Sequence, residues 1–220
     1  MKQTALKISL VIGLGLLLII SAQAQIGEDL LQKTKRAEAL NNQAVDLIET
    51  GKFAQAVELL REAIRLRSDY TIAYGNLGAA FYRTGKFAES IDALKKAIEL
   101  KSDYPEDYNK LGAIYAKTNK TDEAVTLFEH AVAIQPDFAP AYYNLGCVYS
   151  RLKKFKKAIV SIEQVVRLEP QNAEARFLLG RMYLLKNDKQ SAQIQYKNLA
   201  ALDPLLARKL YSAIYANLLI

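Results

Sequence analysis

The chain has 220 residues, 51% of them hydrophobic, and its 30 Lys and Arg against 23 Asp and Glu give a formal net charge of +7. A single His and a single Cys exclude an internal disulfide and a zinc site of His and Cys ligands, and they leave no set of residues for a catalytic triad. The charge is only mildly basic and no Arg-rich or Gly-rich arm accompanies it, so we expect no nucleic-acid binding.

The first 24 residues have the layout of a secretory signal peptide. Two lysines precede an apolar run at residues 8–20, and a small-x-small cleavage site ends at Ala24, before Gln25. The apolar run of 13 residues is shorter than the roughly 20 that span a bilayer as a helix. We therefore predict an exported protein, periplasmic or secreted, that is cleaved between Ala24 and Gln25. The alternative is an uncleaved membrane anchor formed by residues 8–20.

Residues 25–36 connect the first 24 residues to the remainder of the chain. From residue 28 they contain neither Pro nor Gly, and they run without a break into the next segment. This predicts a helical extension, and we expect one long helix from about Glu28 to Thr50. The acidic Glu28 and Asp29 are favourably placed at its positive end.

A motif recurs every 34 residues along the rest of the chain. Residues 73–82 read Ala-Tyr-Gly-Asn-Leu-Gly-Ala-Ala-Phe-Tyr, and a close copy at residues 141–149 follows 68 positions later. Further copies occupy residues 107–115 and 175–183. With Gly78 as the eighth residue of its unit, the chain divides without insertion into units at 37–70, 71–104, 105–138, 139–172 and 173–206. Repeats of this length stack, so that neighbouring units bury one another's apolar faces.

Each unit is predicted to be a helical hairpin. In the second unit, apolar residues and Gly78 are spaced at i, i+3, i+4 and i+7, which is typical of an amphipathic helix, and a second such run follows. The place between the two helices holds Gly or Asn in four units and Lys153 in the fourth unit. Gly and Asn tolerate the left-handed conformation that ends many helices, so this place is the predicted turn.

The repeat resembles the tetratricopeptide repeat family over residues 37–206. The third unit carries nearly the whole motif of that family, at Tyr108, Leu111, Gly112, Tyr115, Ala124, Phe128, Ala131 and Pro136. The first and fifth units depart from the motif, as terminal repeats do. The resemblance implies an all-α fold, a right-handed α-solenoid of five 34-residue helical hairpins, with residues 207–220 as a capping helix.

The predicted capping helix has two apolar faces. Leu210, Ile214 and Leu218 would pack on the fifth unit, whereas Tyr211, Tyr215 and Leu219 would lie on the outer side. An apolar outer face indicates a partner or self-association. The alternative is that the tail folds back more closely on the repeats.

In this family the first helix of each unit lines a concave inner face, which the resemblance implies is the surface that binds a partner. The residues that we expect on it are Arg83, Lys117, Arg151, Asn76, Asn109, Asn144, Tyr82, Tyr143, Phe177 and Arg181. The first three share one place in successive units, which predicts a row of cations spaced by about 10 Å. This set favours an extended acidic protein or peptide with aromatic anchors, and the alternative is a solvated, unused face.

Asparagines recur at the sixth place of three units, as Asn42, Asn76 and Asn144, and Lys110 and Leu178 interrupt them. In some relatives within the family, a similar ladder of amides holds a peptide backbone. A packing role is the alternative here.

The sequence predicts no enzyme, cofactor, metal site or small-molecule substrate, because no nucleophile, base or ligand set is apparent. His130 is expected to face outward, and Cys147 to be a small, half-buried residue. We therefore predict an exported scaffold that binds a protein or peptide on its concave face. The alternative is a structural subunit of an envelope or membrane-proximal assembly that uses its convex face, the turn at Lys153 and its tail.

Overall fold

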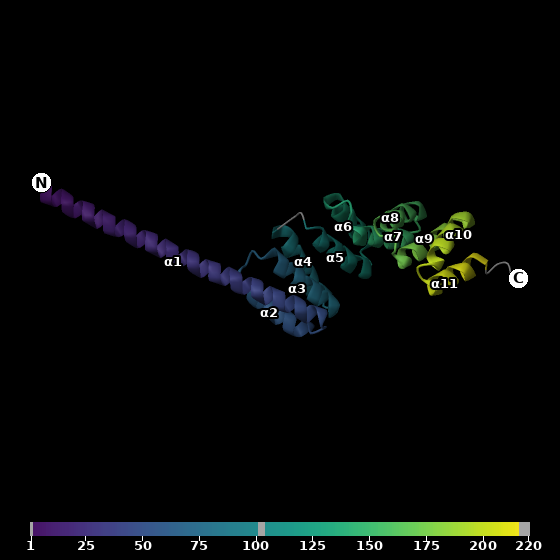
Figure 1. Cartoon of the computed structure of the whole chain (residues 1–220), viewed down its shortest axis with the longest axis horizontal. Helices are drawn as coiled ribbons and strands as arrows, with labels where there is room; N and C mark the ends of the chain where they lie inside the picture. The colour runs from purple at the N-terminus through teal and green to yellow at the C-terminus, as the bar shows by residue number, and fades with distance from the viewer. Residues whose placement is uncertain (1, 101–103, 216–220) are drawn as a thin grey trace. The chain divides into compact units, whose positions relative to one another are not determined.

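The computed structural model describes residues 2–100 and 104–215, with the backbone alone for residues 2–20. All the regular secondary structure in these ranges is α-helical (Figure 1). The predicted all-α fold of helical hairpins is therefore confirmed.

The chain forms two compact units, Met1–Ala93 and Leu94–Ile220. Described residues of the first unit form α1 (Lys2–Glu49), α2 (Phe53–Leu66), α3 (Thr71–Arg83) and the start of α4 (Phe87–Leu100). Those of the second form the rest of α4, α5 (Pro105–Lys117), α6 (Thr121–Ile134), α7 (Ala139–Arg151), α8 (Phe155–Leu168), α9 (Ala173–Leu185), α10 (Lys189–Ala200) and α11 (Pro204–Tyr215).

The turn inside each hairpin has one residue in the left-handed conformation. The φ angle is 76° at Gly51 and 75° at Gly85, and it is 62°, 57° and 60° at Asn119, Lys153 and Asn187. The next backbone N–H donates to a carbonyl five residues earlier, as from Lys154 to Tyr149 at 2.8 Å, which is the pattern of a Schellman motif. Four of these turns use the residue types that favour the conformation, whereas Lys153 adopts it against the steric preference of a side chain with a β-carbon.

Helix α1 is longer than the sequence analysis predicted, since it begins at Lys2 and not near Glu28. The added segment is rich in Leu and Ile, and no Pro interrupts it. The side chains of residues 21–33 are exposed, and the buried contacts of α1 begin at Ala37. Where side chains are described, no helix is long and apolar enough to cross a membrane. The apolar run at 8–20, on which the predictions of a signal peptide and of an anchor rest, lies outside that range.

The first compact unit packs α1, α2 and α3 around a core of small and aliphatic side chains. Leu60, Ala63 and Ala73 are fully buried in it. At the hairpin of α3 and α4, the buried Ser90 hydroxyl donates to the Gly78 carbonyl at 2.6 Å. A side chain this small lets the two helices approach closely, and the bond satisfies a hydroxyl that would otherwise be costly to bury.

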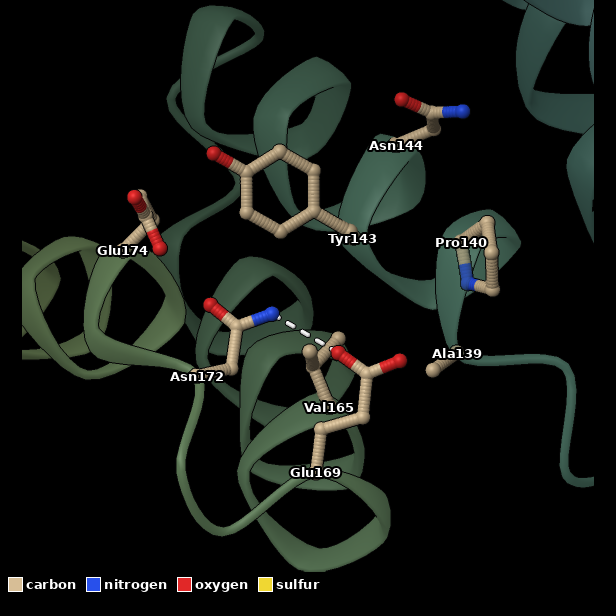
Figure 2. A pocket seen from close by; sticks show the side chains of 8 residues that line it. All are labelled: Ala139, Pro140, Tyr143, Asn144, Val165, Glu169, Asn172 and Glu174. Atoms are coloured by element: carbon tan, nitrogen blue, oxygen red, sulfur yellow. Dashed lines mark hydrogen bonds between the residues drawn. The ribbon is translucent and has the colours of Figure 1, made fainter.

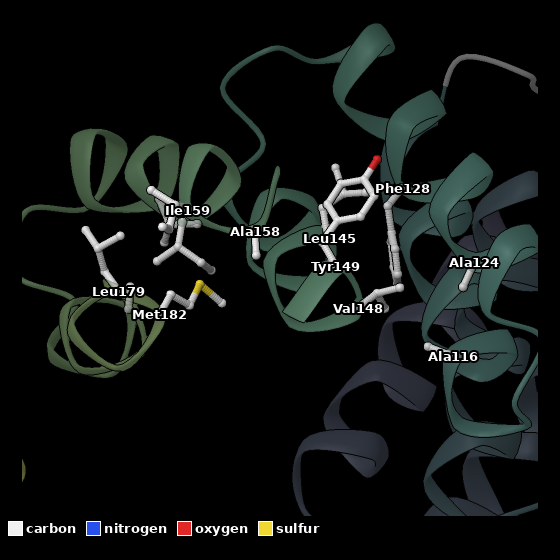
Figure 3. Packing of buried hydrophobic residues seen from close by; sticks show 13 residues of the cluster. Ala116, Ala124, Phe128, Leu145, Val148, Tyr149, Ala158, Ile159, Leu179 and Met182 are labelled. Atoms are coloured by element: carbon white, nitrogen blue, oxygen red, sulfur yellow. The ribbon is translucent and has the colours of Figure 1, made fainter. Parts of the chain in front are cut away.

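The second compact unit depends on glycines at the eighth place of its repeats. A β-carbon at Gly112 would lie 2.7 Å from Cε1 of the buried Phe128, and one at Gly146 would collide with Ile162. At Gly180 the colliding side chain is Leu210 of α11. Figure 3 shows Phe128 packed beside residues of α7 in the core of this unit. The space above each glycine is thus filled by a large side chain from another helix.

Tyrosines at the eleventh place connect successive hairpins. The Tyr149 hydroxyl of α7 donates to Glu129 Oε1 of α6 at 2.6 Å, and the Tyr183 hydroxyl of α9 donates to Glu163 Oε1 of α8 at 2.6 Å. Burial, and next the bond to the carboxylate, raise the pKa of both hydroxyls above the ordinary value of 10.0. These tyrosines therefore favour folding in their protonated form.

The capping helix begins at Pro204, three residues before the predicted start at 207. Proline at the first helical position and the Asp203 carboxylate, which accepts from the backbone N–H groups of Leu205 and Leu206, explain the earlier start. Leu210 and Ile214 are buried as predicted. Tyr211 is 47% exposed, and Tyr215 is half-buried beneath it. The predictions for Leu218 and Leu219 fall outside the described residues.

We expect Gly112→Leu to destabilise the protein more than His130→Ala. The leucine side chain must displace Phe128, which costs about 3 kcal/mol. His130 is exposed as predicted, yet its ring centroid lies 4.6 Å from that of Tyr108, so its removal costs about 1 kcal/mol. Urea unfolding of the two variants measures both values, and equal losses would contradict the close approach at Gly112.

We also expect the free energy of unfolding to fall as the pH rises above about 10. Because the folded-state pKa of Tyr149 and Tyr183 is raised, their stabilisation is complete below the unfolded pKa and is lost as the pH rises through the folded pKa. Replacing both by Phe should make the fall shallower in urea titrations between pH 9 and 12. Tyr211→Phe, which removes an exposed hydroxyl, is the control, and a slope that changes equally in both variants would refute the assignment.

Candidate functional site

The ten residues that the sequence places on the inner face are distributed over both compact units. Tyr82, Arg83 and Asn76 lie on α3, in the first unit. The other seven lie in the second unit, on α5 (Asn109 and Lys117), α7 (Tyr143, Asn144 and Arg151) and α9 (Phe177 and Arg181). Arg83 and Lys117 belong to different compact units, and the cation spacing between them stays a prediction.

The asparagines pair with one another between first helices. Asn76 Nδ2 donates to Oδ1 of the buried Asn41 at 2.9 Å, and Asn144 Nδ2 donates to Asn109 Oδ1 at 2.8 Å. Each bond joins the fifth place of one unit to the sixth place of the next. Asn42, which the sequence analysis put in the ladder, is exposed. These hydrogen bonds support a packing role for the asparagines, because each pair holds two first helices side by side.

Lys110, which interrupts the asparagine ladder, has a partner within its own helix. Its ammonium lies 3.2 Å from Oδ1 of Asp107, a residue with no exposed surface. Burial raises the pKa of the Asp107 carboxyl, and the charge of Lys110 opposes that rise. Lys110 therefore neutralises a buried carboxylate beside the asparagine pair.

The predicted cations Arg83 and Arg151 contact groups on neighbouring helices. The guanidinium of Arg83 lies 5.5 Å from the ring centroid of Phe53, and Nη1 of Arg151 donates to the Ala116 carbonyl at 2.9 Å. That carbonyl belongs to the last turn of α5, where carbonyls lack partners inside the helix. Arg151 thus ties α7 to α5 with one N–H group of a guanidinium that carries several. Arg83 and Arg151 are therefore not merely solvated charges, because both also contact a neighbouring helix.

Along α7, Tyr143, Cys147 and Arg151 follow at intervals of four residues and form one stripe. Burial raises the pKa of the half-buried Cys147 thiol, and Arg151 and a hydrogen bond from Tyr143 oppose the rise. Cys147 is therefore a protonated, half-buried side chain at neutral pH. On α9, Arg181 lies 5.9 Å from the ring centroid of Phe177, one turn away. Each of these two helices thus carries an aromatic and a cationic side chain on one stripe.

A cavity of about 340 Å³ opens beside Tyr143, between the start of α7 and the turn that connects α8 to α9. Figure 2 shows its lining, which combines the ring of Tyr143 with Pro140, Val165, Glu169, Asn172 and Glu174 among others. Asn172 Nδ2 donates to Glu169 Oε2 at 2.7 Å, and Asn172 Oδ1 accepts from the backbone N–H of Ala175 at 2.9 Å. Asn172 is thus the N-cap of α9 and also holds the Glu169 carboxylate in place.

The sequence analysis missed the two glutamates that line this cavity. Pro140 and Glu174 occupy the second place of their units, three residues before Tyr143 and Phe177. That spacing puts the second and fifth places on one helix face, and it could have identified Glu174. Glu169 lies in a turn between units, where helical periodicity gives no information.

Nothing in the described ranges resembles a metal site, since no group of three or more His, Cys, Asp or Glu lies close enough together to hold an ion.

Sequence comparison identifies the repeat. Models of the tetratricopeptide repeat match residues 41–105 and 139–172, and a further TPR repeat model matches residues 114–153. Comparison with curated protein sequences finds no match.

Solved structures share the fold at low sequence identity. YrrB, described as a TPR protein with an unusual peptide-binding site, is 19% identical, with a TM-score of 0.65 over 83% of this chain and 95% of YrrB. PilF of Pseudomonas aeruginosa is 18% identical, with a TM-score of 0.73 over 85% of this chain and 92% of its own. MamA of Desulfovibrio magneticus RS-1 is 23% identical, with a TM-score of 0.68 over 77% of this chain and 96% of the MamA chain. At these identities the likeness is one of fold. Taken with the matched repeats, the hairpins and the glycine packing, it shows that the chain belongs to the tetratricopeptide repeat family.

Proposed function

We propose that this protein is a scaffold that binds a partner protein or an extended peptide on the inner face of its first helices. The observation that supports this most is the second compact unit. Its first helices carry the amides Asn109 and Asn144, and they carry aromatic side chains (Tyr143 and Phe177) and cationic side chains (Lys117 and Arg151) at equivalent places. The Asn109 and Asn144 pair and the bond from Arg151 to Ala116 fix these helices before any partner arrives. A surface organised in advance loses less conformational entropy on binding. The peptide-binding site described for YrrB, a protein of the same fold, agrees with this proposal.

The partner that we propose is acidic near the carboxyl ends of the first helices. Lys117 and Arg151 are the last residues of α5 and α7, and both are exposed. Opposite charge across an interface raises the association rate and selects among partners. The aromatic rings of Tyr143 on α7 and Phe177 on α9 are half-buried and offer apolar contact area. A binding role, and not catalysis, is what this set of side chains supports.

Export is the second part of the proposal, and it rests on the sequence of residues 1–24. Cleavage after Ala24 would leave the first hairpin intact, because the side chains of residues 21–33 are exposed and the packed part of α1 begins at Ala37. Retention of the segment as a membrane anchor is the alternative.

A structural role through the outer surface is the second candidate, and α11 favours it. Leu205 is 73% exposed, Tyr211 is 47% exposed, and a cavity of about 340 Å³ lies between Tyr196, Pro204, Arg208 and Tyr211. The ring centroids of Tyr196 and Tyr211 are 5.4 Å apart, so the patch is aromatic. Exposed apolar patches of this kind often mark an interface.

Peptide selection tests the inner-face proposal directly. From a phage library of random 12-residue peptides, the full chain should enrich sequences that combine Asp or Glu with aromatic residues. Lys117→Glu should weaken the binding of a selected peptide about 10-fold to 100-fold in fluorescence anisotropy, since a reversed charge at an interface costs a few kcal/mol. Added salt should weaken binding to the native protein more than to the variant.

Lys154→Glu is the matched control, because Lys154 is an exposed lysine in the turn between α7 and α8. It should leave the affinity unchanged, and thermal melts should show both variants folded. Loss of binding in Lys154→Glu with full binding in Lys117→Glu would move the site to the outer surface. Enrichment of no peptide would overturn the proposed function.

The export proposal predicts that the protein isolated from its natural host begins at Gln25. Signal peptidase requires small residues such as Ala22 and Ala24 before the cleaved bond. Intact mass spectrometry distinguishes the cleaved from the complete chain. A mass that includes Met1 to Ala24 would favour the membrane anchor.

A further inference from the structure

The lining of the cavity beside Tyr143 combines apolar and acidic side chains. Tyr143, Pro140 and Val165 provide apolar surface, and Glu169 and Glu174 provide two carboxylates, one beside Val165 and the other near the Tyr143 hydroxyl (Figure 2). The eight residues that line it include two carboxylates but neither Lys nor Arg. The negative charge of the cavity is therefore not balanced by a cation within its lining.

The basic residues two positions from each glutamate, Arg167 and Arg176, have other partners. Nε and Nη2 of Arg167 donate to Gln164 Oε1 at 3.0 and 2.8 Å. Nε and Nη2 of Arg176 donate to the Pro170 carbonyl at 3.0 and 2.8 Å, which fixes this guanidinium on the backbone of the turn. Glu169 keeps its position through the bond from Asn172, and Asn172 is fixed in turn by the backbone of α9. One carboxylate is thus positioned before any ligand binds. Figure 2 shows Glu174 on the hydroxyl side of the Tyr143 ring, and its charge contributes to the raised pKa of Tyr143, after burial and Cys147.

A cavity of this kind suits a long cationic side chain. The methylene groups of Lys or Arg can lie along an apolar surface while the charged end meets carboxylates. The face of a tyrosine ring attracts a cation in addition. An arginine can also form two parallel hydrogen bonds with one carboxylate, and such pairs are among the strongest polar contacts in proteins.

We propose that this cavity binds an Arg or Lys side chain of the partner, with the charged group between Glu169 and Glu174 and the stem against Pro140 and Tyr143. This proposal rests on the proposed function. It adds that the inner face of the second compact unit is positively charged at one end of its first helices and negatively charged at the other end. Lys117 and Arg151 lie at the carboxyl ends of α5 and α7, whereas the carboxylates Glu169 and Glu174 lie near the amino ends of α7 and α9. Tyr143 and Arg151 are eight residues apart on one helix, which is about 12 Å.

The partner should therefore carry both signs of charge. An extended chain advances about 3.3 Å per residue, so a basic residue about four positions from an acidic one spans the distance between the two ends of α7. A purely acidic peptide would place a carboxylate beside Glu169 and Glu174, where like charges repel.

The first test uses N-acetylargininamide as a probe, titrated into the full chain labelled with nitrogen-15. Backbone amide signals of Tyr143, Asn172 and Glu174 should shift, and the neutral isostere N-acetylcitrullinamide should leave them in place. In a variant with Glu169→Gln and Glu174→Gln, the dissociation constant for the arginine probe should rise about tenfold. Glutamine at 169 still offers an oxygen to Asn172, so the turn should stay folded.

A variant with Asp122→Asn and Glu123→Gln is the matched control. Both residues are exposed and lie in the first turn of α6. The control therefore also removes two negative charges, and it also removes a favourable interaction of an acidic side chain with the amino end of a helix. It should bind the arginine probe like the native protein. Absence of shifts in the native protein, equal shifts with the citrulline probe, or equal affinity in the Glu169 and Glu174 variant would each overturn the proposal.

The peptides selected above separate this proposal from the proposed function. Enriched peptides should contain Arg or Lys about four positions from an acidic residue, and they should bind the Glu169 and Glu174 variant about tenfold more weakly. Peptides that bind the inner face without any basic residue, and bind this variant with native affinity, would overturn the cavity proposal and leave the scaffold function in place. If no peptide binds, the scaffold proposal fails, and the arginine probe alone decides whether the cavity recognises a cationic side chain.

Discussion

Close approach of neighbouring helices at the eighth place of each repeat controls the packing of the second compact unit. At Gly112 and Gly146, the space of the missing β-carbon is occupied by Phe128 and Ile162 from the second helix of the same hairpin. At Gly180 it is occupied by Leu210, so α11 completes the fifth repeat in the way that a second helix completes the others. Interiors packed to this density tolerate little change in volume, and the rotation of each first helix is fixed as a result.

That rotation determines which side chains reach the proposed inner face. Once the eighth place is turned toward the second helix, the second, fifth, ninth and thirteenth places share a different stripe. The stripe contains Tyr143, Cys147 and Arg151 on α7, and Glu174, Phe177 and Arg181 on α9. The hydrogen bond from Arg151 to Ala116 then fixes α7 against α5. The helix packing thus determines which side chains make up the candidate site. One of these side chains, Arg151, also holds two of the helices together.

Periodicity predicted the features that repeat, and it could not predict those that depend on contacts between units. The hairpins, their turns at Gly51, Gly85 and the asparagines, and the buried faces of Leu210 and Ile214 all follow from residue spacing. The hydrogen bond between Asn109 and Asn144 joins residues 35 positions apart on two helices. Predicting it requires knowing how far one helix is shifted along its axis relative to the other. The same holds for Glu169, whose place in the cavity depends on a turn and on Asn172. The start of α1 at Lys2 was missed because the segment was assigned to a signal peptide and not to a helix.

The asparagine pairs give the array a second, longer period. Asn41 pairs with Asn76, and Asn109 pairs with Asn144, but the fifth place of the second unit is Gly75 and the sixth place of the third is Lys110. Removal of residues 71–104 alone would put Asn41 opposite Lys110, whereas removal of residues 71–138 would put Asn41 opposite Asn144 and restore an amide pair. As far as the asparagine pairs are concerned, the building block of this protein is a double repeat of 68 residues. A chain shortened by such a block keeps an asparagine opposite an asparagine.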